Sequence, residues 1–230
     1  MELKEKLVSS FIAFENQISL DNTFVHSMRT EALTHFENKG FPEKKEEAWK
    51  YTSLKKVLKE DFSVFSKTEH ALEYKDVQPY FIHDIDSYKI VFVDGKYASH
   101  LSQTTHDGID ICLMSYALEK PKYRSVIENY FNKIIEKNSL TSLNTAFVNE
   151  GAYIHITKNK LVEKPIQIIH FSTGNEAALL LQPRNLIVVD ENAHVQIIER
   201  HQSLTDNPTL TNSVTEIFAA KRGIIDYYKV

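Results

Sequence analysis

The feature that most constrains the fold of this sequence is a change of period at residue 151. From Gly151 onward, short apolar segments are separated by turn residues; they read AYIHIT, PIQIIHF, NLIVV, HVQIIER, SVTEIF and GIIDYYKV. Apolar runs of this length between turn residues indicate buried β-strands. A sandwich of hairpins would favour tight Asn-Gly or Asp-Gly turns, and neither dipeptide occurs after Gly151. The pattern therefore favours parallel strands joined by wider connections.

A repeat of 30 residues runs through these segments. With this offset, residues 186–188 fall on 216–218, and the stretch AHVQI from Ala193 falls on GIIDY from Gly223. Small residues then overlay at one turn and apolar residues overlay along the strand, as stacked coils require. An earlier coil through Ile154 and Ile166 matches if a residue or two slips. We therefore predict a mainly β chain that contains a parallel β-helix.

The first 140 residues follow other patterns. Apolar residues from Leu3 to Ile18 recur every three or four positions, which predicts an amphipathic helix, and a second such stripe ends before Gly40. Asp94-Gly95 between apolar flanks predicts a β-hairpin, and a strand followed by helices is expected over 109–134. We expect an N-terminal mixed α/β, largely helical domain over 1–140 and the first coils of the β-helix over 141–230.

The segment from Arg184 to Gln202 combines histidines, carboxylates and arginines in an apolar run, so it is a candidate metal or acid/base site. Glu199 and His201 lie on one face of a strand, because side chains alternate. A metal ion needs three or four converging ligands, and the repeat-equivalent positions are Lys229 and one beyond the end. His155 and His170 belong to other strands and are expected to be packed or surface residues. The sequence therefore predicts no metal ligands.

Catalytic signatures are also missing from the sequence. Glu216 and Asp226 are candidate carboxylates for a polyuronide-cleaving groove, but they overlay Leu186 and Gln196, so no carboxylate ladder begins there. No G-x-S-x-G, Walker-type, G-x-G-x-x-G or C-x-x-C motif occurs. Cys112 has apolar neighbours, which favours a buried, inert thiol. We predict no catalytic residues and no enzyme.

Charge and composition narrow the classes of partner. The chain has 27 basic and 31 acidic side chains, for a formal net charge of -4, which gives no electrostatic basis for nucleic-acid binding. The single cysteine excludes an internal disulfide framework. The N-terminal segment is charged from its second residue and contains no long apolar stretch, so neither a signal peptide nor a membrane anchor is expected. The chain is expected to be cytoplasmic.

Four segments carry a resemblance to a known family. In chain order they read EEAWKYTSL, SLNTAFVNEGAYIHI, QPRNLIVVDENAHVQIIERH and LTNSVTEIF. Together they resemble the SufB/SufD family of the Suf iron–sulfur cluster assembly scaffold, with SufD as the better match and SufB as the alternative. The resemblance covers most of the chain from about Glu46.

The resemblance implies a right-handed parallel β-helix behind a helical domain. It also implies a non-catalytic scaffold subunit that pairs with a SufB-like protein and a SufC-like ATPase to build clusters from iron and sulfide. No cofactor is expected on this chain alone, because the cluster is expected only on the assembled complex. The alternative function is a β-helix carbohydrate-active enzyme, a polyuronide lyase or hydrolase, since a fold does not fix a function.

Two further expectations follow from the resemblance. The chain is about half the usual length of the family and ends in an apolar strand without a polar capping coil, so we expect a truncated β-helix that self-associates through its last strand. Family ligand and contact residues are expected in the missing half, so no catalytic, cofactor or metal residue is assigned. Trp49, Tyr51 and Thr52 match a family motif and are expected to pack the helical domain against the first coils, with Trp49 as a partner anchor in the alternative view.

Overall fold

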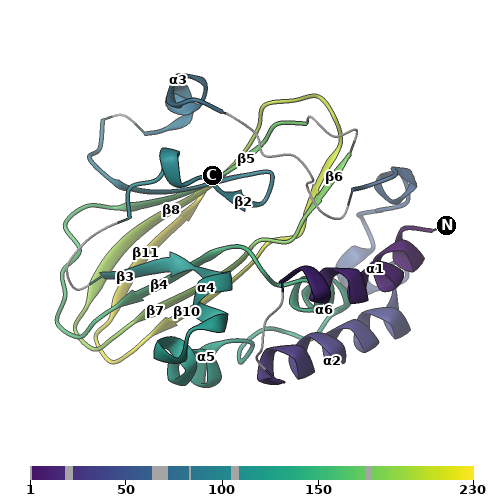
Figure 1. The fold of residues 1–230 in the computed structure, drawn as a ribbon, viewed down its shortest axis with the longest axis horizontal. Coiled ribbons are helices and arrows are strands. Elements are labelled where there is room, and N and C mark those ends of the chain that lie inside the picture. The colour runs from purple at the N-terminus through teal and green to yellow at the C-terminus, as the bar shows by residue number, and fades with distance from the viewer. Residues whose placement is uncertain (1, 19–22, 64–71, 83, 105–108, 175–177) are drawn as a thin grey trace.

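The computed structural model describes residues 2–230 except 19–22, 64–71, 83, 105–108 and 175–177 (Figure 1). The helices are α1 (Leu3–Ile18), α2 (Thr23–Lys39), α3 (Tyr74–Val77), α4 (Met114–Glu119), α5 (Arg124–Tyr130) and α6 (Ser139–Ala146), with five short 3-10 turns. The strands are β1 (Tyr88–Val93), β2 (Lys96–Tyr97), β3 (Ile109–Leu113), β4 (Ala152–Ile156), β5 (Ile166–Ser172), β6 (Leu179–Leu181), β7 (Arg184–Val189), β8 (His194–Ser203), β9 (Thr209–Thr211), β10 (Val214–Ala219) and β11 (Ile224–Lys229). Within the described ranges, no helix is both long and apolar enough to span a membrane.

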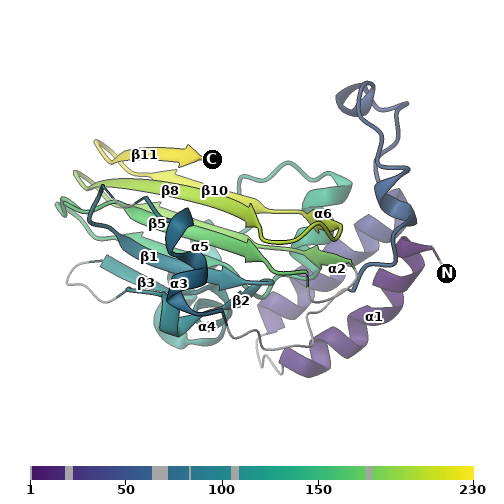
Figure 2. The ribbon, with the colours of Figure 1, turned by 90° about the horizontal axis from the view of Figure 1, so that it is seen from above.

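The strands form sheets dominated by parallel pairing. One sheet has the order β11-β8-β5-β1-β2, a second β10-β7-β4-β3 and a third β6-β9. Among the strand pairs of the described residues, only β1–β2 and β3–β4 are antiparallel. Seen from above, β1, β5, β8 and β11 lie side by side in this order as neighbouring strands of one sheet (Figure 2). Helices α1, α2 and α6 lie together at one end of the strands (Figure 1).

The predicted 30-residue register is confirmed. Ile187 pairs with Ile217 in β7 and β10, and Val195 pairs with Ile225 in β8 and β11. The earlier coil slips as expected at Ile166, which pairs with Ile197, one residue more than the repeat. At Ile154 the partner is Ile187, so the slip is larger than predicted. Despite these slips, paired residues on adjacent strands point to the same face, and that face of every coil contributes to one apolar core.

The corner between these sheets repeats as well. Asn159, Asn192 and Arg222 occupy it in three successive coils, each with positive φ, at 63°, 57° and 60°. Asn192 Nδ2 donates to Asn159 Oδ1 at 2.9 Å, which ties one turn to the next. Asparagine tolerates the left-handed conformation better than most residues, which explains its use at two of the three corners.

Gly151 marks the entry into the stack because of a close backbone approach. Its φ is 147°, and a Cβ built there would lie 1.9 Å from the Arg184 carbonyl oxygen. Any side chain at this position would therefore push β4 away from β7. The change of period in the sequence coincides with this contact.

The expectation of a mainly β chain was overstated. Helices occupy about as much of the described chain as strands do. The short helix α6, capped by Asn138 through hydrogen bonds from Leu140 N and Thr141 N, extends past residue 141, where the first coils of the β-helix were expected to begin. Strands β1 and β3 of the first 140 residues pair with β5 and β4 of the later segment. The domain division at residue 140 stays a prediction.

The predicted local elements of the first half are confirmed. α1 has the predicted bounds and buries one stripe of apolar residues, and Gly40 follows α2 with φ 71°. Asp94 and Gly95 have φ of 47° and 79°, as a type I′ turn between β1 and β2 requires.

The segment around Trp49 does not pack as expected. In Figure 2 the blue-violet segment near residue 50 projects away from the helices. Tyr51 is 89% exposed, and Trp49 is half-buried but belongs to none of the apolar clusters of the described residues. The expectation that these aromatics pack the helical domain against the first coils is therefore wrong for Tyr51 and unsupported for Trp49.

Candidate functional site

The interior of the strand stack changes from apolar to polar along β5 and β8. Ile166 and Ile168 of β5 point into the apolar core, and His170 continues the same face. On β8, Ile197 belongs to the core and Glu199 and His201 follow on its face. Strand alternation therefore brings one carboxylate and two imidazoles to one place inside the molecule.

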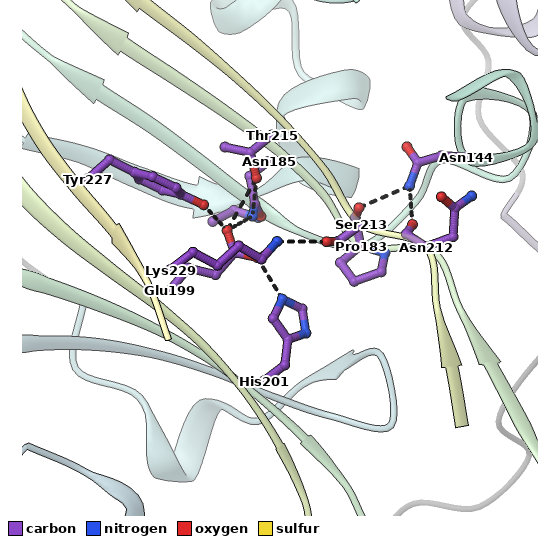
Figure 3. Close-up of polar contacts among 11 residues, drawn as sticks. Asn144, Pro183, Asn185, Glu199, His201, Asn212, Ser213, Thr215, Tyr227 and Lys229 are labelled. Atoms are coloured by element: carbon purple, nitrogen blue, oxygen red, sulfur yellow. Dashed lines mark hydrogen bonds and ion pairs between the residues drawn. The ribbon is translucent and has the colours of Figure 1, made fainter. Parts of the chain in front are cut away.

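Glu199 is the centre of this cluster and is fully buried. Its Oε2 accepts hydrogen bonds from Tyr227 OH, from Thr215 Oγ1 at 3.2 Å and from Asn185 Nδ2 at 3.3 Å. Its Oε1 lies 2.6 Å from His201 Nε2 and 3.0 Å from Lys229 Nζ (Figure 3). The partners come from β8, β11 and the facing strands β7 and β10, so the carboxylate joins both sheets.

These partners decide the charge of Glu199. Burial alone would raise the pKa of its carboxyl group, but the hydrogen bonds from His201 and Tyr227 and the charge of Lys229 outweigh burial and lower the pKa. The carboxylate is therefore ionised and can act as an acceptor or as a ligand.

His170 and His201 lie side by side on adjacent strands. They are paired in the β5–β8 register, and their rings stack with centroids 4.5 Å apart and an interplanar angle of 8°. His170 Nε2 is buried and has no hydrogen-bond partner. One ligand atom from each of His170, Glu199 and His201 lies within 4.8 Å of the other two.

The structure brings a third potential ligand to Glu199 and His201, although the sequence analysis found none at the repeat-equivalent positions. The third group comes from the preceding coil, not from the following one. His170 and His201 are separated by the 31-residue step that also relates Ile166 to Ile197. That step, applied backwards from His201, is the signal in the sequence that would have found His170.

A cavity of about 760 Å³ opens beside the cluster, and His170 lines it. Glu150 and Gln182 also line it, and Glu150 Oε2 and Gln182 Nε2 are buried without a hydrogen-bond partner. Burial raises the pKa of Glu150 to about 7, an effect that the charge of Lys96 partly opposes. Three of the residues that line the cavity therefore each hold one buried polar atom without a hydrogen-bond partner.

The remaining sequence candidates occupy structural positions. Glu216 is fully buried, and its Oε2 forms an ion pair of 2.6 Å with Arg184, which is equally buried. Asp226 overlays Gln196, as predicted, and accepts from it on the surface. Burial raises the pKa of the Cys112 thiol to about 12, which keeps this half-buried group protonated.

Two outer histidines pair with carboxylates instead of joining the cluster. His155 Nε2 lies 3.1 Å from Asp190, and His194 Nε2 lies 3.1 Å from Asp226. All four side chains are partly exposed. The placement of His155 agrees with the expectation of a packed or surface residue, and both histidines are separate from the trio His170, Glu199 and His201.

Helices followed by stacked, mostly parallel strands around a core that is apolar along most of its length define a repetitive α/β frame. The chain belongs to the SufBD family: the model of the SufBD protein N-terminal region matches residues 1–168, and that of the SufBD core domain of SUF system FeS cluster assembly matches 170–230. This confirms the family resemblance.

Curated relatives carry related names. An iron-sulfur cluster assembly SufBD family protein of Synechocystis is 25% identical over 197 residues, which cover 82% of this chain and 43% of that protein. The iron-sulfur cluster assembly protein SufD of Bacillus subtilis is 30% identical over 111 residues, 46% of this chain and 25% of that protein. SufD of Escherichia coli is 24% identical over 194 residues, 83% of this chain and 42% of that protein. The chain spans less than half the length of these relatives.

Proposed function

We propose that this chain works as a non-catalytic scaffold subunit in iron–sulfur cluster assembly, together with a SufB-like protein and a SufC-like ATPase. The observation that carries the proposal is the match of two consecutive SufBD family models along the chain. Relatives named SufD support the SufD branch. The cluster is the cargo of the assembled complex, and the work takes place in the cytoplasm.

We also propose that the stacked strands are the first coils of a right-handed parallel β-helix. The in-register pairs of β7 with β10 and of β8 with β11 support this reading. Parallel ladders with buried ion pairs give a stiff frame, which suits a subunit that transmits motion from an ATPase to a partner. β10 and β11 are edge strands of their sheets among the described residues, so further strands can pair with them.

For the alternative of a polyuronide-cleaving enzyme, one of the two candidate carboxylates is inaccessible to substrate. General acid/base chemistry needs a side chain within reach of substrate. Glu216 is fully buried and ion-paired with Arg184, so its carboxylate cannot contact a polysaccharide.

The test is purification of the natural full-length chain, tagged and expressed with its genomic neighbours, without oxygen. We expect a SufB-like protein and an ATPase to elute with it in stoichiometric amounts. The tag alone, expressed beside the same neighbours, is the control. Elution of the chain by itself, combined with lytic activity on polyuronides, would overturn the proposal.

A further inference from the structure

The trio His170, Glu199 and His201 has the composition of a metal site. Two imidazole nitrogens and one carboxylate oxygen suit Zn²⁺, Co²⁺ and Fe²⁺, and three protein ligands leave coordination positions open. The three ligand atoms lie within 4.8 Å of one another inside the strand stack. We propose that this trio binds one divalent transition-metal ion. The proposal is independent of the assembly role.

An unsatisfied atom points to a ligand at this place. His170 is 4% exposed, and its Nε2 has no hydrogen-bond partner. A buried polar group without a hydrogen-bond partner destabilises the folded protein. A purely structural role of the cluster accounts for Glu199, whose two oxygens have five partners, but not for His170 Nε2. A metal ion would satisfy it.

The surroundings support the site. His170 lines the cavity of about 760 Å³, so the trio lies beside a space that can hold water or an anion. Asn185, Thr215 and Tyr227 hold Oε2 of Glu199 and leave Oε1 on the side of His201. Hydrogen bonds of this kind orient ligating carboxylates in metal sites.

Binding requires two small movements. Ligand atoms at 2.0–2.2 Å from an ion lie about 3.4 Å apart in a tetrahedral site, so the trio must contract. A metal ion lies in the plane of each imidazole ring that binds it. The rings of His170 and His201 are parallel, so one of them must turn out of the stack. Lys229 must also leave Oε1, and its side chain, 47% exposed, can do so while keeping its 2.8 Å hydrogen bond to Ser213.

The experiment is a titration of the metal-stripped, full natural chain with Co²⁺, followed by calorimetry and by visible absorption. We expect one Co²⁺ per chain and displacement by Zn²⁺. His170→Gln should weaken binding at least about 100-fold, since it removes one of three ligands. His155→Gln is the matched control, because His155 also faces a carboxylate, that of Asp190 directly after the neighbouring strand β7. The Co²⁺ affinity of this variant should equal that of the wild type.

Lys229→Met should change the Co²⁺ affinity in the direction opposite to His170→Gln. Removing the competing charge at 3.0 Å from Oε1 should tighten Co²⁺ binding several-fold, whereas a site elsewhere would not respond. Should His170→Gln fail to fold, paramagnetic broadening of the His170 and His201 imidazole signals in the wild type replaces it. Absence of saturable binding in both wild type and Lys229→Met, or affinity unchanged by His170→Gln, would overturn the proposal.

Discussion

Arg184 and Glu216 form the most deeply buried ion pair of the described residues, with no exposure of either side chain. Glu216 also accepts from the backbone N–H groups of Asn132 and Lys133, and Arg184 donates to Asn144 and Thr145. The pair therefore fastens the segment after α5 and the helix α6 to β7 and β10. Burial lowers the pKa of Arg184, and the charge of Glu216 opposes that effect.

Glu216→Gln should lower the free energy of unfolding by about 3–5 kcal/mol, because it leaves the Arg184 charge buried without a counter-charge. Urea unfolding followed by circular dichroism measures the change. Asp226→Asn, an exposed carboxylate on the neighbouring β11, should change it by less than about 0.5 kcal/mol. Equal effects of both substitutions would contradict this role of the pair.

Glu150 makes stability depend on pH. Its folded-state pKa is raised to about 7 by burial, above the ordinary value of 4.5, so the folded state holds a proton that the unfolded state has released. Stability is then full below about pH 4.5 and falls as pH rises toward 7. Glu150→Gln should remove this loss and stabilise the protein by up to about 2 kcal/mol at pH 8, but not at pH 4.5. Thermal unfolding at both pH values is the measurement, and an equal shift at both would count against the assignment.

At this scale only part of the polar interior could be predicted from the sequence. Strand alternation places Glu199 and His201 on one face, and the repeat overlays Lys229 on Glu199; both predictions are confirmed. His170 was not predicted to join them, because the coil before β8 is offset by 31 residues and not by 30. The pairing of Arg184 with Glu216 was not predicted either, because the register places Glu216 opposite Leu186, two residues along the strand from Arg184.

At the scale of elements, the regular segments were predictable and their partners were less so. Helical periodicity and the Asp-Gly turn are local signals, and α1 and the β1–β2 hairpin follow them. The parallel pairing of β1 with β5 joins residues about 78 apart in the sequence, as Tyr88 pairs with Ile166, and no local pattern encodes such a contact. α6 was missed because it buries polar residues, which give no apolar stripe in the sequence. Among them, Asn144 Nδ2 donates to the carbonyl oxygens of Pro183 at 3.0 Å and Asn212 at 2.8 Å.

The projecting segment around Trp49 belongs to this scale. Double replacement Trp49→Ala and Tyr51→Ala should change the free energy of unfolding by no more than about 1 kcal/mol, since Tyr51 is exposed and Trp49 lies outside the apolar clusters. The same variant should lose co-purification of a partner, because exposed aromatics on a projecting segment are typical interface anchors. Tyr116→Ala, an aromatic 47% exposed on α4, is the control. Unchanged recovery of the partner would remove the anchor role.

At the scale of the whole molecule, the edge of β11 decides how the 230-residue chain behaves in solution. Ile224 and Tyr228 on this strand are 52% and 55% exposed. Unpaired strand edges with apolar side chains pair with other chains. We expect concentration-dependent self-association, reduced by Ile224→Lys with Tyr228→Lys but not by Ile134→Lys, an exposed apolar residue elsewhere. Sedimentation velocity measures it, and a strictly monomeric wild type at high concentration would refute the expectation.

The partners of Glu199 also impose an order in time. Asn185 and His201 lie near it in the sequence, but Thr215, Tyr227 and Lys229 belong to strands that leave the ribosome later. Until β10 and β11 have docked, the Glu199 carboxylate remains open to water, and the coil that contains β8 lacks these contacts. We expect the coils to fold one after another during synthesis, each new coil covering the one before it. Nascent chains halted after Ser203 should then be cleaved by protease in β8, whereas nascent chains that include β11 should be protected there.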